Sequence, residues 1–107
     1  NLYNKMSQRS FTVERVENVH GKKLTRFNGG RYLSSTPVSA AKKVVSHVCR
    51  AIDVHGQCTF IVTVRETTRG SLNKSYCYKI KRVLDPVIVE HDGVEIEHAY
   101  RIEAHAH

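Results

Sequence analysis

The segment RETTRGSLNKSYCYKIKR, residues 65–82, gathers the side chains with the clearest chemistry in this chain. It contains one acid, Glu66, and six cations. The cations are Arg65, Arg69, Lys74, Lys79, Lys81 and Arg82. Guanidinium and ammonium groups hold phosphate oxygens through charge and hydrogen bonds, so the segment predicts contact with a polyanion. The competing interpretation is that lysines on an outer strand face protect a sheet edge from aggregation.

The distribution of charge along the chain favours the first interpretation. Of 107 residues, 17 are Lys or Arg and 10 are Asp or Glu, which gives a net charge of +7. Residues 1–83 carry 16 Lys or Arg against four acids, whereas residues 84–107 carry one Arg against six acids. A basic part and an acidic part of one small chain predict two different surfaces, of which the basic one suits a nucleic acid.

Seven histidines and three cysteines invite a search for a metal centre or a nucleophile. No cysteine or carboxylate spacing completes a zinc site around the C-terminal histidines. These are His91, His98, His105 and His107. His47 and Cys49 stand two residues apart in a predicted helix, so they do not face each other as a base and a nucleophile would. We therefore expect no enzyme, and no catalytic residue, metal, cofactor or small-molecule substrate.

The cysteines are Cys49, Cys58 and Cys77. Because their number is odd and no C-x-x-C spacing occurs, we expect reduced thiols rather than a disulfide framework. Reduced thiols are typical of an intracellular protein. No apolar run approaches the ~20 residues that cross a bilayer, so we expect no membrane partner.

The elements that must position these side chains begin after a polar stretch. Residues 1–9 lack periodicity and predict a flexible or peripheral arm, and residues 10–107 have the length of a single domain. SFTVERVENV, residues 10–19, alternates like a first strand, and KLTRF, residues 23–27, reads as a second strand. Gly29-Gly30 interrupts or bulges the chain that follows.

Residues 35–53, STPVSAAKKVVSHVCRAID, predict a helix. The Thr36 hydroxyl can accept a free N–H of the first turn, and Pro37 suits the first helical position because no N–H is needed there. At 3.6 residues per turn, an apolar stripe forms along one side. It consists of Ala41, Val44, Val45, Val48 and Ile52. A stripe of small and β-branched side chains predicts that the helix packs on a sheet.

Four strand-like segments follow the predicted helix. They are residues 57–67, 74–83, 87–91 and 94–104. Pro86 separates the second segment from the third, and Asp92-Gly93 is the hairpin signal between the last two. The predicted order is β-β-α-β-β-β-β. We therefore expect an α+β fold, a small antiparallel pseudo-barrel of five to six strands with one helix between strand 2 and strand 3.

Alternation decides which side chains of the basic hairpin face solvent. Burying an unpaired lysine costs too much free energy, so Lys79 and Lys81 must point outward with Arg65. Arg69 and Lys74 extend this basic side around the loop. The side chains expected in the core are Phe60, Val62, Val64, Tyr76, Tyr78 and Ile80. Because the tyrosines point inward, we expect phosphate contact without sequence reading rather than stacking on unpaired bases.

Two segments together resemble a known family. FNGGRYLSSTPVSAAKKV resembles a Gly followed by Pro-x-x-Ala-Ala-x-Lys at a helix entrance. VRETTRGSLNKSYCYKIK resembles a hairpin pattern of Arg-Glu, Gly, Lys, aromatic and Lys. Both patterns occur in this order in the archaeal methanogen chromosomal protein (type one) family and in its relatives from large DNA viruses of eukaryotes. The resemblance covers residues 10–82.

The resemblance implies a pseudo-barrel with one helix, and a small, monomeric, non-histone chromosomal protein that binds, bends and compacts double-stranded DNA. Carried over to matching positions, the residues that touch phosphates or a groove are Arg65, Arg69, Lys74, Lys79 and Lys81. Arg82 closes the same basic run, and Arg31 extends it near the helix entrance. Lys42 and Lys43 are further extensions. Their assignment rests on the polar side of the predicted helix more than on the family motif.

This chain departs from the archaeal pattern in ways that affect the expected function. It has no Trp, the connection VLDPV is short, and the C-terminal hairpin is acidic, so we do not expect strong bending. The closer likeness is to the viral members. The alternative function is therefore a structural virion protein, a minor capsid or capsid-associated component, whose acidic hairpin meets another virion or capsid protein. The expected location is intracellular or, for a viral protein, the virion nucleoid or capsid and the host cell.

Overall fold

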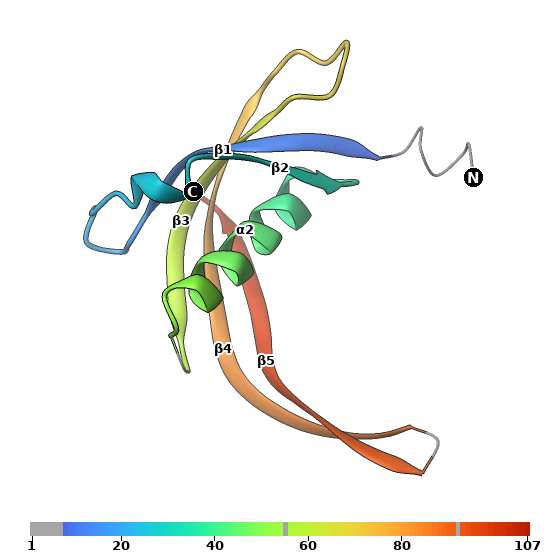
Figure 1. Ribbon diagram of the computed structural model, residues 1–107. Coiled ribbons are helices and arrows are strands. Elements are labelled where there is room, and N and C mark those ends of the chain that lie inside the picture. Colours follow the sequence, from blue (N-terminus) through green and yellow to red (C-terminus); the bar gives the residue numbers. More distant parts are fainter. Residues whose placement is uncertain (1–7, 55, 92) are drawn as a thin grey trace.

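The computed structural model describes residues 8–54, 56–91 and 93–107, and of residues 84–91 and 94–100 it describes the backbone. These residues form one α-helix and five antiparallel strands in a single curved sheet (Figure 1). The elements are β1 (Arg9–Glu17), a 3-10 helix η1 (Thr25–Phe27), β2 (Gly29–Ser34), α2 (Pro37–Ala51), β3 (Cys58–Glu66), β4 (Ser75–His91) and β5 (Val94–Ala106). The strand order is β2-β1-β3-β4-β5, so the sheet is open, with β2 and β5 at its edges.

The α+β class and the place of the helix between the second and third strands are confirmed. The Thr36 hydroxyl accepts a hydrogen bond from the Ser39 N–H at 3.2 Å, and Pro37 is the first helical residue. The helix buries six side chains against the sheet, which include most of the predicted stripe. They are Ala40, Ala41, Val44, Val45, Val48 and Cys49. None of the described helices is long and apolar enough to cross a membrane.

The second strand does not lie where the sequence predicted it. KLTRF makes a single bridge to β1, Glu17 with Lys23, and then winds into η1 instead of continuing as a strand. Leu24 and Phe27 are three residues apart, which lets both pack partly against the core from one turn of helix. Pairing with β1 begins only at Gly29, whose φ of +90° turns the chain back toward β1.

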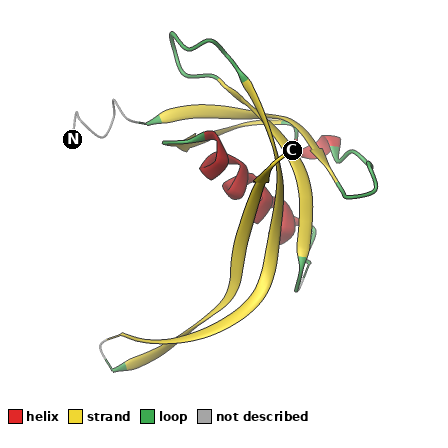
Figure 2. Ribbon diagram, turned by 180° about the vertical axis from the view of Figure 1, so that it is seen from behind, coloured by secondary structure: helices red, strands yellow, loops and turns green. Residues whose placement is uncertain are grey.

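The predicted break at Pro86 is also wrong, because β4 runs through it from Ser75 to His91. The pairing of β4 with β5 shifts register between Leu84 and Val87, and this irregularity accommodates the missing N–H of the proline. Asp92 lies outside the described residues, and β5 starts at Val94. The far part of this long hairpin reaches well past the helix (Figures 1 and 2).

The core lies between α2 and the face of the sheet that the helix covers, called the inner face below. Strands β1, β3 and β4 contribute alternate residues to it, as predicted for β3 and β4. Those buried are Phe11, Val13, Val16, Phe60, Val62, Val64 and Ile80. Tyr76 and Tyr78 are half-buried and pack against this cluster, so their predicted inward orientation is confirmed. Arg9, predicted as the end of the arm, is instead the first residue of β1.

A disulfide joins the end of α2 to the start of β3. It links Cys49 and Cys58, which are both buried, while Cys77 is free. The expectation that all three cysteines are reduced is therefore wrong. The two thiols meet because a turn with positive φ at Asp53 and Gly56 folds the strand back beside the helix. A spacing of nine residues carries no recognisable signal, so the spacing rule could not find this pair.

Candidate nucleic-acid interface

The side of the sheet opposite α2 carries a line of cations on its central strands. Alternation puts odd-numbered residues of β3 and β4 on this outer side, because the even-numbered ones face the helix. Arg65 stands opposite Ser75, Ile61 opposite Lys79 and Thr59 opposite Lys81. Arg65 and Lys79 are exposed and Lys81 is half-buried. These three cations, Arg65, Lys79 and Lys81, are called the basic face below.

The outer side of β5 both extends and limits the positive charge. Its pairing with β4 sets His105 beside Lys79 and Glu103 beside Lys81. Glu103 forms an ion pair with Arg101 at 2.9 Å. The Arg101 hydrogen bond, with further help from the charge on Lys81, lowers the pKa of the Glu103 carboxyl. The acid therefore remains charged at neutral pH and offsets part of the charge on Lys81.

The other neighbour of the basic face, β1, has mixed charge. Glu17 forms an ion pair with Arg15 at 3.1 Å, and Glu14 accepts a hydrogen bond from the Ser75 hydroxyl. The positive charge is thus concentrated on β3, β4 and the loop that joins them. None of the ion pairs among the described residues involves Arg65, Arg69, Lys74, Lys79 or Lys81.

The loop between β3 and β4, residues 67–74, stands out beyond the end of the sheet (Figures 1 and 2). Its two cations, Arg69 and Lys74, are exposed. The base of the loop is closed by a hydrogen bond from the Glu66 N–H to the Lys74 carbonyl at 2.9 Å. The Thr67 N–H also donates to the Ser10 carbonyl at 2.8 Å, which ties the loop to β1.

Glu66, the only acid of the basic segment, is hydrogen-bonded to Arg9 and Thr68 at the base of the loop. The Arg9 guanidinium donates to both of its carboxylate oxygens at 2.8 Å, and the Thr68 hydroxyl donates at 2.7 Å. The Arg9 and Thr68 hydrogen bonds lower the pKa of Glu66 to about 2 although its burial opposes this. Glu66 raises the pKa of Arg9 in return. The two charges therefore offset each other, and the ion pair ties the base of the loop to β1. We call Arg9, Ser10, Glu66 and Thr68 the loop brace.

The loop brace makes stability depend on pH at the acid end. The usual pKa of Glu66 is 4.5 and the folded value is about 2, so its contribution is fully present above pH 4.5 and is lost as pH falls toward 2. We expect Glu66→Gln to lower the free energy of unfolding by about 2 kcal/mol at pH 7. This difference from the native chain should shrink between pH 5 and pH 2. Urea unfolding across this pH range measures it.

Glu103→Gln is the matched control for this prediction. It removes a carboxylate from an exposed ion pair, so its effect at pH 7 should stay small. A Glu66→Gln deficit that stays constant from pH 7 to pH 2 would contradict the role of the ionised carboxylate and point to a packing defect.

Four of the predicted binding residues lie away from the basic face. Arg31 is exposed on edge strand β2, two strands from β3. Lys42 and Lys43 belong to α2, on the other side of the sheet, and the Lys43 ammonium donates to the Leu33 carbonyl. Arg82 has the parity of buried Ile80 and therefore faces the helix side. The alternation of inward and outward side chains along β4 predicts this orientation, because Arg82 follows Ile80 by two residues.

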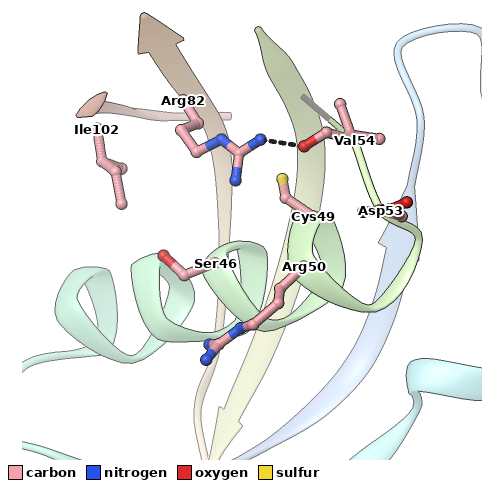
Figure 3. A pocket seen from close by; sticks show the side chains of 7 residues that line it. All are labelled: Ser46, Cys49, Arg50, Asp53, Val54, Arg82 and Ile102. Atoms are coloured by element: carbon pink, nitrogen blue, oxygen red, sulfur yellow. Dashed lines mark hydrogen bonds between the residues drawn. The ribbon is translucent and has the colours of Figure 1, made fainter. Parts of the chain in front are cut away.

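The Arg82 side chain binds the backbone of the turn between α2 and β3, the two elements that the disulfide joins. It donates to the Val54 carbonyl at 2.6 Å and to the Gly56 carbonyl at 3.2 Å. Its guanidinium forms one wall of a hollow of about 420 Å³ beside the end of α2 (Figure 3). The hollow is lined by Ser46, Cys49, Arg50, Asp53, Val54, Arg82 and Ile102. Arg82 is thus a structural residue that satisfies two backbone carbonyls.

Metal-binding groupings are absent from the part of the chain that the structure describes, in which no three His, Cys, Asp or Glu side chains gather around one point. His105 and His107 are exposed at the end of the chain, and the side chains of His91 and His98 lie outside the described residues. Comparison with models of protein families, with curated proteins and with solved structures finds no match for this chain. The family resemblance therefore stays a prediction from the two sequence motifs.

Proposed function

We propose that this protein binds double-stranded DNA without reading its sequence, and compacts it as a chromosomal or nucleoid protein. One observation carries the proposal. Five cations of a single hairpin lie on the basic face and on the adjoining loop, and none takes part in an ion pair among the described residues. They are Arg65, Arg69, Lys74, Lys79 and Lys81. Cations that form no ion pair with the described residues are available to phosphates, although Glu103 offsets part of the charge on Lys81.

The geometry favours phosphate contact over base recognition. Residues two apart on a strand, such as Lys79 and Lys81, stand roughly 7 Å apart on one face. Two neighbouring phosphates of one DNA strand have a comparable separation. The tyrosines that would stack on unpaired bases pack inward instead. Phosphate contacts position a duplex and supply affinity but carry no sequence information.

Salt dependence tests this function directly. If four or five cations each neutralise a phosphate, the logarithm of affinity should fall with the logarithm of salt with a slope of about −4. Raising the salt from 50 to 200 mM should then weaken binding about 250-fold. Fluorescence anisotropy with a labelled random duplex measures this slope.

A second random duplex of equal length and similar base composition, without an A-tract, is the control, and it should bind with the same affinity and slope. Undetectable binding at 50 mM salt, or binding that ignores salt, would overturn the proposal.

The second candidate is a structural virion protein that contacts a capsid neighbour. The observation that favours it is the β4–β5 hairpin, whose far part extends beyond the helix and has an acidic sequence. A two-stranded hairpin is only marginally stable alone, so a protein partner along it would supply packing. Cross-links from this hairpin to a neighbouring protein in an assembled particle, with no salt-sensitive DNA binding, would favour this candidate.

A further inference from the structure

The loop of the basic hairpin presents an apolar side chain to solvent. Leu72 is 82% exposed, more than any other large hydrophobic residue among those that the structure describes. Val19 and Leu33 follow at 51% and 39%. Leu72 stands in the sequence between the exposed cations Arg69 and Lys74, in the loop that projects from the sheet (Figure 1, yellow). A single exposed leucine is ordinary on a protein surface. Leu72 differs because it stands between two cations of the loop that we propose to contact DNA.

Hydrogen bonds hold the loop backbone on both sides of Leu72. The Ser71 N–H donates to the Thr68 carbonyl at 3.0 Å, which closes a turn just before Leu72. The Asn73 N–H donates to the Ser71 hydroxyl at 3.3 Å, which fixes the residue just after it. Thr68 in turn belongs to the loop brace, where its hydroxyl accepts from the Ser10 N–H at 2.9 Å. A loop backbone held in this way loses little conformational entropy when the loop meets a binding partner.

We infer that Leu72 is a wedge that enters a base step of the DNA duplex and gives the protein a preference for easily kinked steps. The inference rests on the proposed DNA binding, and it adds a residue that contacts bases to a site otherwise made of phosphate contacts. Phosphates held by Arg69 and Lys74 on either side of Leu72 would direct its side chain toward the groove between them. Charge complementarity thus selects a nucleic acid as the occupant over an apolar protein pocket.

The physical consequence is selection by deformability. An apolar side chain inserted in the minor groove unstacks one step and kinks the duplex, at a cost that depends on the step. TA steps unstack easily, whereas A-tracts are stiff. A protein with a wedge therefore prefers a duplex with a central TA step, although it makes no base-specific hydrogen bond. A protein that uses phosphate contacts alone binds both duplexes about equally.

The test compares two duplexes of equal length, one with a central TA step and one with a central A-tract, at a fixed low salt. We expect the native chain to prefer the TA duplex about fivefold and to raise energy transfer between dyes at its two ends. Leu72→Ala should remove the preference and the rise in energy transfer, while its affinity for the A-tract duplex and its salt slope stay unchanged. Leu72→Ile, which keeps an apolar side chain of the same size, should retain the preference.

Val19→Ala is the matched control, because it truncates another exposed apolar residue in the turn after β1 and should behave like the native chain. Equal affinity of the native chain for both duplexes, or a preference that survives Leu72→Ala, overturns the wedge and leaves the proposed function standing. Failure of the native chain to bind either duplex overturns both.

Discussion

Reversing two charges of the basic face, with Lys79→Glu and Lys81→Glu together, should weaken binding to duplex DNA at least 100-fold at 50 mM salt. The double variant loses two phosphate contacts and sets two carboxylates against the phosphate backbone. Glu103, which lies beside Lys81, would then stand next to a like charge and add to the repulsion. The salt slope should fall by about 2, one for each lost contact, and all sequences should be affected alike. Anisotropy titrations over a salt series measure both quantities.

The double variant Lys42→Glu and Lys43→Glu is the matched control for this prediction. It changes the net charge by the same amount but places the change on α2, across the sheet from the basic face. Its affinity should fall much less. An equal loss in both double variants would show that net charge, rather than the basic face, governs binding. Circular dichroism and thermal unfolding of each variant establish that the fold is retained.

The parts of the fold that could be predicted are those written in local sequence. The helix is marked by a cap at Thr36, a proline at its first position and a stripe of period 3.6, and all three depend on neighbours within a few residues. The inward orientation of Phe60, Val62 and Val64 follows from alternation with polar neighbours in one strand. Such signals need no knowledge of the rest of the chain.

The parts that could not be predicted depend on contacts between distant segments. KLTRF has the composition of a strand, but it winds into a 3-10 turn from which Leu24 and Phe27 pack partly against the core. Pro86 usually ends a strand, yet a register shift against β5 absorbs it. Neither outcome is visible until the partner strand and the core surface are known.

The candidate site shows the same division. The basic face follows from alternation, but its acidic neighbours do not, because Glu14 and Glu103 reach it from β1 and β5. Of the acidic part of the sequence, Glu103 is therefore brought beside the basic face by the pairing of β5 with β4. The loop brace likewise joins Arg9 to Glu66 across 57 positions of sequence. Its existence explains how an acid can lie inside a basic segment without repelling phosphates.

Reduction of the Cys49–Cys58 disulfide should lower the free energy of unfolding by about 2.5 kcal/mol, because the cross-link closes a short loop and restricts the unfolded chain. For a domain of about 100 residues this corresponds to a fall in Tm of roughly 10–20 °C. The loss should be concentrated at the end of α2, where the turn is otherwise held by the hydrogen bonds from Arg82 to Val54 and Gly56. Thermal unfolding with and without a reductant measures the shift.

Cys77→Ser provides the control that assigns this effect to one bond. Cys77 is free in the folded chain, so the variant should show the same Tm as the native protein and the same fall on reduction. The double variant Cys49→Ala and Cys58→Ala should start at the lower Tm and be insensitive to the reductant, apart from a further loss from the two buried sulfur atoms. The unsubstituted chain can be unfolded without a reductant and its reactive thiols counted. Three reactive thiols, together with a Tm that does not change on addition of the reductant, would contradict the disulfide. One reactive thiol and a large shift would show that the covalent link, rather than the hydrophobic contact of α2 alone, holds the end of the helix to β3.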